Sequence, residues 1–394
     1  MAFMNDFGTI LLLLAEFPVW SEAFLHREIA ALLDRDKRFR AAALRGTPSS
    51  HPPLEIISGT SEPAAAAPGR PSKLPRPLRA MGSSLRHRAA RRALTDYCHR
   101  NGVQHIHAEF CDLPAELARV VARRLGISYS VGAHARDVFC CKYNLANLLK
   151  EARFATVCNG AARDALLRNG SVEDRRCHLV HHGLPLDDWP FQHTRPPGRD
   201  LRLLWAGRMV PKKGLDLLLN ALALFGESHA AFGADATWSL SLFGEGCEAL
   251  RLRRLAGSLR LEPHLRWHSP RCASELREAF NQADALVLPA CIAPDGDRDG
   301  IPNIALEAMA SGLPVVATTT GGLRDIITPE TAWVAESATA EGVADALDAF
   351  ADPADGTREQ RSLCARRRVE ADFDLETTAA VRQRLFSQAL EEKL

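Results

Sequence analysis

The chain has 394 residues, of which 46% are hydrophobic and 25% charged, and its formal net charge at pH 7 is +1. Because one domain usually takes about 100–200 residues, two domains are expected. The near-neutral charge creates no field of the kind that attracts nucleic acid, so nucleic acid is not expected as a partner. The ten cysteines include no CxxC pair. This argues against a disulfide scaffold or a zinc ribbon and favours reduced thiols in a cytoplasmic protein.

The first half of the chain alternates between strand and helix patterns. The apolar run ILLLLA from Ile10 is too short to span a bilayer and follows Asp6 instead of a positive charge, so it is predicted to be a buried strand. An amphipathic helix is predicted at 21–35, and residues 46–77, rich in Pro, Ser, Ala and Gly, are predicted to form a long loop or insertion. Later strands are expected at 105–110, 127–137 and 154–160, with helices at 114–126 and 144–152.

A second alternating series follows the linker-like residues 193–198. Its expected strands are 201–206, 238–246, 265–269, 285–290 and 314–318, and its expected helices are 215–225, 248–259, 274–283 and 304–310. Strands that alternate with helices predict parallel sheets covered by helices. The predicted fold class is therefore α/β, with two doubly wound, Rossmann-like domains facing a cleft. The amphipathic segment at the end of the chain is predicted to be a closing helix.

The loop GRMVPKKG, residues 207–214, lies between an expected strand and an expected helix. Arg208 can pair its guanidinium with phosphate oxygens, Lys213 adds a point charge, and the helix start adds unpaired N–H groups. The loop lacks the GxxxxGK[ST] spacing of a Walker loop. These residue types favour an anion site, although a basic surface turn explains the same residues.

Two further turns in this domain join a strand to a helix. FGEG places Gly244 and Gly246 at a strand end, where glycines let a flat group approach the backbone, although such turns also use Gly for conformational reasons alone. In DGIPNIALEAMASG, residues 299–312, backbone N–H groups at the helix start and the Glu307 carboxylate can bind a ligand's polar groups. A basic site, glycine turns and hydroxyl-binding carboxylates match the parts of a nucleotide sugar.

The combination of GRMVPKKG, LFGEG and DGIPNIALEAMASGLPVVATTTGG resembles the retaining, nucleotide-sugar-dependent glycosyltransferases of family 4, which have the GT-B fold. The segments FPVWSEAFLHREI, HIHAEF, GAHARD and HHGLPLDDW extend the similarity over nearly the whole chain, and SEAF and HARD look most like the bacterial subgroup that builds exopolysaccharide and lipid-linked oligosaccharide. The resemblance implies an acceptor-binding domain at 1–195, a donor-binding domain at 196–375, and a C-terminal helix at 376–394 that packs back toward the first domain.

The resemblance also implies roles for single residues. Arg208 and Lys213 match the pair that neutralises the donor diphosphate, and Glu307 matches the acid that binds the ribose hydroxyls. Asp299 stands where the family usually has Glu beside the donor sugar; it is one methylene shorter, so its contact can be moved, bridged by water, or supplied by Asp297 or Asp295. The remaining donor-binding candidates are Gly244, Glu245, Gly300, Ile301, Pro302 and Asn303. No metal or cofactor is expected besides the nucleotide-diphosphate sugar as co-substrate, because the DxD-like Asp295-Gly296-Asp297 fits a loop better.

In the first domain, His134 of GAHARD matches a family histidine beside the transferred sugar. The candidate catalytic residues are His134, Asp299, Arg208 and Lys213, and the candidate acceptor-binding residues are Ser21, Glu22, His107 and Asp137. Structural roles remain open for several of them: a helix N-cap explains Ser21, and a buried structural histidine explains His107. His181 and His182 precede Gly183. A site role near the cleft and simple packing near the linker are equally consistent with these two histidines.

Between Arg70 and Arg92 the chain carries eight Lys and Arg residues and no acid, with Leu and Met interleaved. Each such residue near an anionic membrane contributes ~1 kcal/mol, so 70–92 can hold a cytoplasmic enzyme at the inner face of the membrane. An ordinary solvated helix after a loop explains the same run and is slightly favoured. The predicted function is retaining transfer of a sugar from a nucleotide-diphosphate sugar to a glycan or lipid-linked acceptor in polysaccharide biosynthesis, by a hexosyltransferase. The alternatives are a GT-B epimerase or phosphorylase and a non-catalytic nucleotide-sugar-binding subunit.

Overall fold

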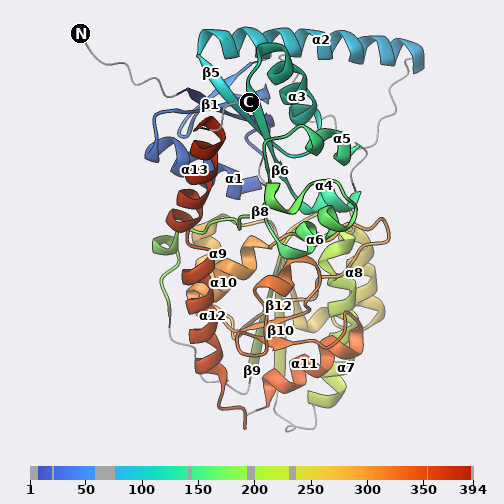
Figure 1. The fold of residues 1–394 in the computed structure, drawn as a ribbon. Coiled ribbons are helices and arrows are strands. Elements are labelled where there is room, and N and C mark those ends of the chain that lie inside the picture. Colours follow the sequence, from blue (N-terminus) through green and yellow to red (C-terminus); the bar gives the residue numbers. More distant parts are fainter. Residues whose placement is uncertain are drawn as a thin grey trace. The chain divides into compact units, whose positions relative to one another are not determined.

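The computed structural model describes residues 8–19, 22–57, 76–140, 144–192, 200–229, 237–352 and 354–391 (Figure 1). The chain divides into two compact units. The first comprises Met1–Val157, Arg163–Gly183 and Leu375–Leu394, and the second comprises Cys158–Ala162 and Leu184–Asp374. The predicted bounds of 1–195, 196–375 and 376–394 differ from this division. The chain enters the second unit at Leu184, before the Pro-rich linker, because Leu184 and Trp189 are buried in that unit's core.

The first unit contains an eight-stranded sheet in the order β3-β4-β2-β1-β5-β6-β7-β8, in which only the β3–β4 pair is antiparallel. The strands are β1 Thr9–Phe17, β2 Phe39–Gly46, β3 Ser49–Ser50, β4 Pro53–Ile56, β5 Val103–Glu109, β6 Ser128–Ala133, β7 Ala155–Val157 and β8 Cys177–Leu179. The helices are α1 Ala23–Arg35, α2 Arg76–Arg100, α3 Leu113–Leu125, α4 Ala135–Cys140, α5 Leu145–Lys150, α6 Gly160–Arg168 and α13 Leu375–Glu391.

The second unit contains a six-stranded, fully parallel sheet in the order β11-β10-β9-β12-β13-β14. The strands are β9 Asp200–Ala206, β10 Thr237–Phe243, β11 Leu265–His268, β12 Ala285–Leu288, β13 Val315–Ala317 and β14 Trp333–Val334. The helices are α7 Leu215–His229, α8 Ala249–Ser258, α9 Ala273–Gln282, α10 Asn303–Ser311, α11 Ala340–Ala351 and α12 Arg358–Asp372. The prediction of two α/β units with parallel sheets is confirmed.

Continuous apolar runs form the central strands because helices cover both faces of these sheets. In β1, residues 10–14 are all buried. In β9, Leu203 and Trp205 contribute to one hydrophobic cluster of the second unit, whereas Leu204 and Ala206 contribute to another. Successive side chains of a strand point to opposite faces, so the two clusters lie on the two sides of this sheet.

The C-terminal helix α13 belongs to the first unit, where it packs beside α1 (Figure 1). Phe386 of α13 is buried in the core that also contains Ile10 and Phe39. The prediction that this helix returns to the first domain is therefore confirmed.

The sequence missed or misjudged several elements. Strand β2 was not predicted, and part of the expected loop at 46–77 is regular, because β4 pairs with β2 in parallel register and β3 pairs with β4. Residues 58–75 of that segment lie outside the described residues. Among the helices of the described ranges, none is both long and apolar enough to cross a membrane.

Candidate active site

The basic loop of the second unit connects β9 to α7. Gly207–Val210 leads into a single 3₁₀ turn, Pro211–Lys213, and Gly214 then takes a left-handed conformation with φ of +62°. A Cβ atom on Gly214 would lie 1.8 Å from the carbonyl oxygen of Pro289, so only glycine fits there. The loop therefore has a fixed backbone, in which Gly214 ends the turn that carries Lys212 and Lys213.

The glycines of FGEG hold this loop from the side. A Cβ on Gly244 would lie 1.9 Å from the oxygen of Gly207, and a Cβ on Gly246 would lie 2.3 Å from the oxygen of Met209. The backbone N–H of Met209 donates a hydrogen bond to the oxygen of Glu245 at 2.8 Å. In this structure the paired glycines serve the close approach of two loops, and the Glu245 side chain is exposed.

Two lysines of the basic loop are paired with the aspartates that precede α10. The Lys213 Nζ lies 2.6 Å from Oδ2 of Asp299. The Lys212 Nζ lies 3.1 Å from Oδ1 of Asp297 and 3.6 Å from Oδ1 of Asp299. Lys212 and Asp299 are both buried, and buried charges in proteins are stable only when they are paired in this way. The structure thus brings together Lys213 and Asp299, which are 86 positions apart in the chain.

A second glycine pair shapes the turn that carries Asp299. The N–H of Gly322 donates to the oxygen of Asp299 at 3.1 Å. A Cβ on Gly321, whose φ is +62°, would lie 2.4 Å from that same oxygen, and one on Gly322 would lie 2.1 Å from the oxygen of Gly300. The segment TTTGG therefore supports the backbone of the candidate site, a role that sequence reasoning did not assign although the pair is visible in the sequence.

The remaining donor candidates follow this turn. Ile301 and Pro302 are buried, Pro302 is the N-cap residue of α10, and Asn303 begins the helix. Glu307 lies one turn further on and is partly exposed, whereas Arg208 is exposed on the basic loop. The start of α10 thus offers its first backbone N–H groups beside the Lys213–Asp299 pair, which is the arrangement of an anion site at a helix start.

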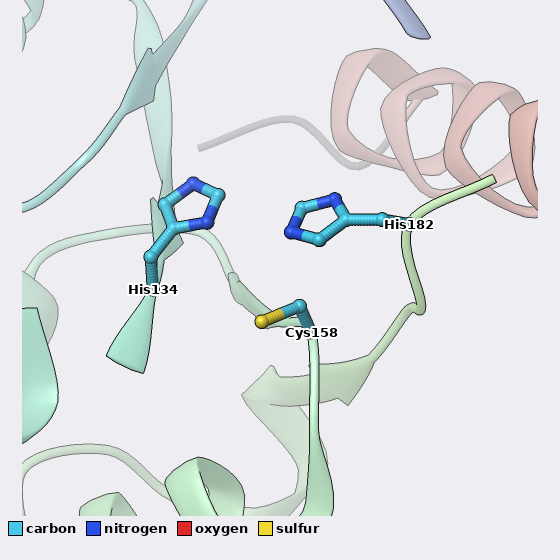
Figure 2. Close-up of side chains that lie close together, drawn as sticks. All are labelled: His134, Cys158 and His182. Atoms are coloured by element: carbon cyan, nitrogen blue, oxygen red, sulfur yellow. The ribbon is translucent and has the colours of Figure 1, made fainter. Parts of the chain in front are cut away.

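In the first unit, His134 follows β6 directly and lies beside Glu109 at the end of β5. The His134 Nε2 is 3.3 Å from Oε2 of Glu109. The ring of His134 also packs against Phe110, with 4.2 Å between ring centroids, and stacks with His182 at 5.3 Å and 7° between planes. Figure 2 shows the two imidazoles turned toward each other, His134 from the end of β6 and His182 from the segment after β8. Cys158, also drawn there, is assigned to the second unit.

Glu109 ends a chain of buried polar side chains that runs between β5 and β6. His105 places Nδ1 2.7 Å from Oγ of Ser128 and Nε2 2.7 Å from Oγ of Ser130. The Ser130 oxygen also lies 2.7 Å from Nδ1 of His107, whose Nε2 is 3.4 Å from Oε1 of Glu109. With its proton on Nε2, His105 donates to Ser130, and Ser130 donates to Nδ1 of His107. Nε2 of His107 lies close to the Glu109 carboxylate but forms no hydrogen bond among the described residues.

The charges along this row of polar side chains agree with that direction of hydrogen bonding. Burial raises the pKa of Glu109, but His107 and His134 outweigh it and hold the pKa well below its usual range, so the carboxylate is ionised. Burial, together with His107 and Arg153, lowers the pKa of His105 to about 3, so its imidazole is neutral. This row of polar side chains therefore presents one fixed negative charge, that of Glu109, to His134.

A second buried carboxylate, Glu28 of α1, holds the neighbouring histidine. His182 Nδ1 lies 2.9 Å from Oε1 of Glu28, and the N–H of Gly183 donates to the same oxygen at 3.2 Å. Arg382 of α13 places its NH2 nitrogen 3.1 Å from the other oxygen of Glu28. Burial raises the pKa of Glu28, but Arg382 and His182 lower it by more than burial raises it. The pKa is therefore below its usual value and the carboxylate is ionised.

The acceptor candidates have varied surroundings. Asp137 is buried in the first turn of α4, where its Oδ2 accepts a hydrogen bond from the N–H of His134 at 2.9 Å. It therefore fixes the backbone of the candidate histidine. His107 is fully buried within the polar chain, which is the structural alternative considered for it. Glu22 is the N-cap residue of α1 without a side-chain cap, and Ser21 lies outside the described residues.

Residues 200–352, which include the basic loop and the Asp299 turn, match the profile of the family described as "Glycosyl transferases group 1". The second unit therefore contains a glycosyltransferase group 1 domain. Glycogen synthase of Mycobacterium tuberculosis (strain ATCC 25618 / H37Rv) is 26% identical to this glycosyltransferase over 370 residues, which cover 87% of this chain and 84% of the relative. The putative colanic acid biosynthesis glycosyltransferase WcaL of Escherichia coli K12 is 29% identical over 193 residues, 49% of this chain and 46% of WcaL.

Among solved structures, that of Anabaena HepE in complex with UDP superposes with a TM-score of 0.73 at 16% identity, over 96% of this glycosyltransferase and 100% of HepE. The likeness establishes the fold as that of the GT-B glycosyltransferases, which confirms the fold implied by the sequence resemblance. The family match confirms an enzyme of the hexosyltransferase class.

Several residues of this glycosyltransferase's candidate site were missed in the sequence. Lys212 is as firmly paired as Lys213, and its pairing could not be foreseen from KK alone. Glu28 and Arg382 are 354 positions apart, and no local pattern connects them. Glu109 lies in the segment HIHAEF but was not predicted as a site residue. A carboxylate at the end of a buried parallel strand is unusual enough to indicate a site.

Proposed function

We propose that the enzyme transfers a sugar, with retention of configuration, from a nucleotide-diphosphate sugar to a glycan or lipid-linked acceptor in exopolysaccharide biosynthesis. The observation that carries the proposal is the Lys213–Asp299 pair at the start of α10, within the family-matched domain. It places a cation and a carboxylate, the partners required by a diphosphate and by sugar hydroxyls, within 2.6 Å of each other.

In this proposal the ion pair is exchanged when the donor binds. A diphosphate carries more negative charge than one carboxylate, so it competes for the Lys213 ammonium. Asp299 is then able to accept hydrogen bonds from the donor sugar, and Lys212 keeps it partly neutralised. Arg208, exposed on the same loop, adds a guanidinium for the diphosphate, and Glu307 accepts from the ribose hydroxyls. As the leaving group departs, the charge that develops on it is stabilised by Lys213 and Arg208.

The same ion pairs support transfer without a metal ion. Divalent cations in such sites are held by carboxylates, but the carboxylates of Asp297 and Asp299 are already neutralised by Lys212 and Lys213. The lysines would supply the positive charge that a metal supplies in other transferases. Addition of EDTA to a metal-free assay is expected to leave the rate unchanged, and a rate that is restored only by Mg²⁺ or Mn²⁺ would contradict this part of the proposal.

The first unit is proposed to bind the acceptor through His134. The ionised Glu109 orients the His134 ring by accepting from its Nε2–H, and Asp137 fixes its backbone. The other imidazole nitrogen, Nδ1, is then the one that carries the lone pair in the neutral ring and faces away from Glu109. Glu22 and Ser21 remain candidates for the acceptor entrance. The leaving phosphate accepts the proton of the acceptor hydroxyl, as the family resemblance implies.

The relatives support the choice of substrates. HepE was solved with UDP, and WcaL is named for colanic acid biosynthesis. We therefore propose a uridine-diphosphate sugar as the donor and a growing cell-surface polysaccharide or its lipid-linked precursor as the acceptor. A peripheral position at the inner face of the membrane is part of this proposal, and Arg88, Arg91 and Arg92 on the exposed face of α2 support it. The rest of the basic run, before residue 87, has no described side chains.

The central test replaces Lys213 with Ala and uses UDP-glucose as the probe donor. Transfer to bacterial glycan acceptors, or slow donor hydrolysis, is expected to fall by about 10²–10³-fold in kcat, the usual effect of removing one group that stabilises developing charge. Arg254→Ala, an exposed residue of α8, is the matched control and is expected to keep full activity. An unchanged kcat in Lys213→Ala, with circular dichroism showing a folded protein, would refute the mechanism. NMR of the product's anomeric carbon tests retention.

A further inference from the structure

The first unit contains a cavity of about 640 Å³ at the edge of its sheet opposite to His134. Its walls include Ser128 and Tyr129 at the start of β6, residues 151–154 before β7, and part of α13. In a parallel sheet the amino ends of strands form one edge and the carboxyl ends form the other. His134 follows the carboxyl end of β6, so the six residues of this strand, roughly 20 Å, separate the cavity from it.

The cavity is lined by an unusual number of cations. Five arginines contribute to its walls, Arg119, Arg123, Arg153, Arg175 and Arg176, together with His178. Glu151 is the one acidic residue among the residues that line it. Two of the arginines have carboxylate partners nearby, since Arg119 pairs with Glu116 at 3.3 Å and Arg175 pairs with Glu173 at 2.8 Å. Even with those two carboxylates counted, the cations outnumber the acids.

Two of these arginines, Arg119 and Arg176, are incompletely hydrogen-bonded by the described residues. Arg176 donates from NH1 to the carbonyl oxygens of Lys150 and Ala152 at 3.0 and 2.9 Å, which anchors it in the wall. The Nε atoms of Arg119 and Arg176 are buried and have no hydrogen-bond partner among the described residues. A buried donor without a partner is unfavourable, so these two guanidinium groups are not fully satisfied by the protein.

We propose that this cavity binds the phosphate or diphosphate group of a small ligand, at a site separate from the donor site. Several guanidinium groups around one cavity suit an anion with more than one charge, and their fork geometry matches phosphate oxygens. A cavity of this volume falls within the range of small-molecule sites, about 300–1,000 Å³. Ile127, Phe154 and Leu385 provide apolar wall for the remainder of the ligand.

The phosphoryl group can belong to a soluble metabolite or to a lipid head group, and the two sources share this chemistry. The test therefore has two arms. In the first, inorganic pyrophosphate is titrated by calorimetry into the full chain carrying Lys213→Ala, which weakens the donor site in the second unit. In the second, the same protein is sedimented with phosphatidylcholine vesicles that contain or lack phosphatidylglycerol.

The decisive variant is Arg119→Gln/Arg123→Gln, which removes two charges from the cavity wall of α3. It is expected to weaken binding by at least about tenfold, because each hydrogen bond to a charged group contributes more than one factor of ten. The control is Arg124→Gln, an exposed neighbour on α3 that does not line the cavity. Weakened pyrophosphate binding supports a soluble ligand, and weakened binding to the anionic vesicles alone supports a lipid head group. Equal binding by the double variant and the control in both arms would overturn the proposal.

Discussion

The neutral, buried His105 makes the first unit sensitive to acid, and the size of the effect follows from its surroundings. Its pKa is about 3 in the folded protein because of burial, His107 and Arg153, compared with an ordinary value of 6.5. In the unfolded chain His105 takes up a proton as the pH falls below 6.5, whereas in the folded chain it does not until about pH 3. Its contribution to stability is therefore complete above pH 6.5 and is lost progressively as the pH falls.

The magnitude is set by the difference between the two pKa values. Each pH unit below 6.5 costs about 1.4 kcal/mol for one group that binds a proton only when unfolded. Between pH 6.5 and pH 5.0 the loss from His105 is therefore about 2 kcal/mol, a large share of the 5–15 kcal/mol that usually holds a domain folded. Above pH 5 the buried carboxylates of Glu28 and Glu109 remain ionised in the folded state. Burial and Asp137 raise the pKa of Asp112 to about 6, but this group is shared by wild type and variant, so the comparison between them isolates His105.

Urea unfolding of wild type and His105→Gln at several pH values between 5.0 and 7.5 measures the effect. Gln retains hydrogen-bonding groups for Ser128 and Ser130 but cannot titrate. The variant is expected to be less stable at pH 7.5, and the gap to wild type should shrink by about 2 kcal/mol at pH 5.0. His99→Gln, exposed on α2, is the control and should follow the wild-type slope. Parallel curves for wild type and His105→Gln would refute the assignment of a neutral, proton-excluding imidazole.

Three further predictions concern residues that support the candidate sites of the two units. Glu109→Gln keeps the shape but removes the charge that orients the candidate histidine, so kcat for transfer should fall at least about tenfold, with rescue by Glu109→Asp. Gly322→Ala forces a Cβ to within 2.1 Å of a backbone oxygen and should destabilise by about 1–3 kcal/mol and weaken donor binding in calorimetry, unlike Gly356→Ala, which meets nothing within 4 Å. Arg382→Leu leaves Glu28 buried without its cation and should cost about 3–5 kcal/mol in urea unfolding; the double variant with Glu28→Gln should recover part of it.

The fold was predictable because its central strands are apolar on both faces. The runs ILLLL in β1 and LRLLWA in β9 are buried strands of parallel sheets, as their composition indicates. Strand β2, FRAAALRG, was missed because three alanines carry a weak strand preference. Helix α12, REQRSLCARRRVEAD, was missed because its few apolar residues give little periodicity, and its position is fixed by residues such as Val369 in the second unit's core.

The candidate site was predictable where its residues share one loop. GRMVPKKG and DGIPN indicated a basic turn and an acidic turn before helices, and both lie where the parallel topology of the second unit places the carboxyl ends of strands. What the sequence could not provide was the pairing between them. Lys213 reaches Asp299 and Lys212 reaches Asp297 only because β9 and β12 are neighbours in the sheet.

The polar side chains that connect β5 and β6 in the first unit follow a pattern that is visible in the sequence. In β5, His105, His107 and Glu109 recur at every second position, so they share one face of a strand whose other face carries Ile106 and Ala108. In β6 the same spacing gives Ser128, Ser130 and Gly132, and the register sets these opposite the first three in order. Small residues are required there, since a Cβ on Gly132 would lie 2.5 Å from Oε2 of Glu109.

The next residue in that spacing is His134, which follows the end of β6. Two adjacent strands with matching period-two polar and small residues therefore indicate a buried polar contact between their faces, because polar groups inside a sheet must find partners on the neighbouring strand. The histidine that continues the row lies where the row meets the edge of the sheet, and there the charged end of the row, Glu109, lies 3.3 Å from its Nε2.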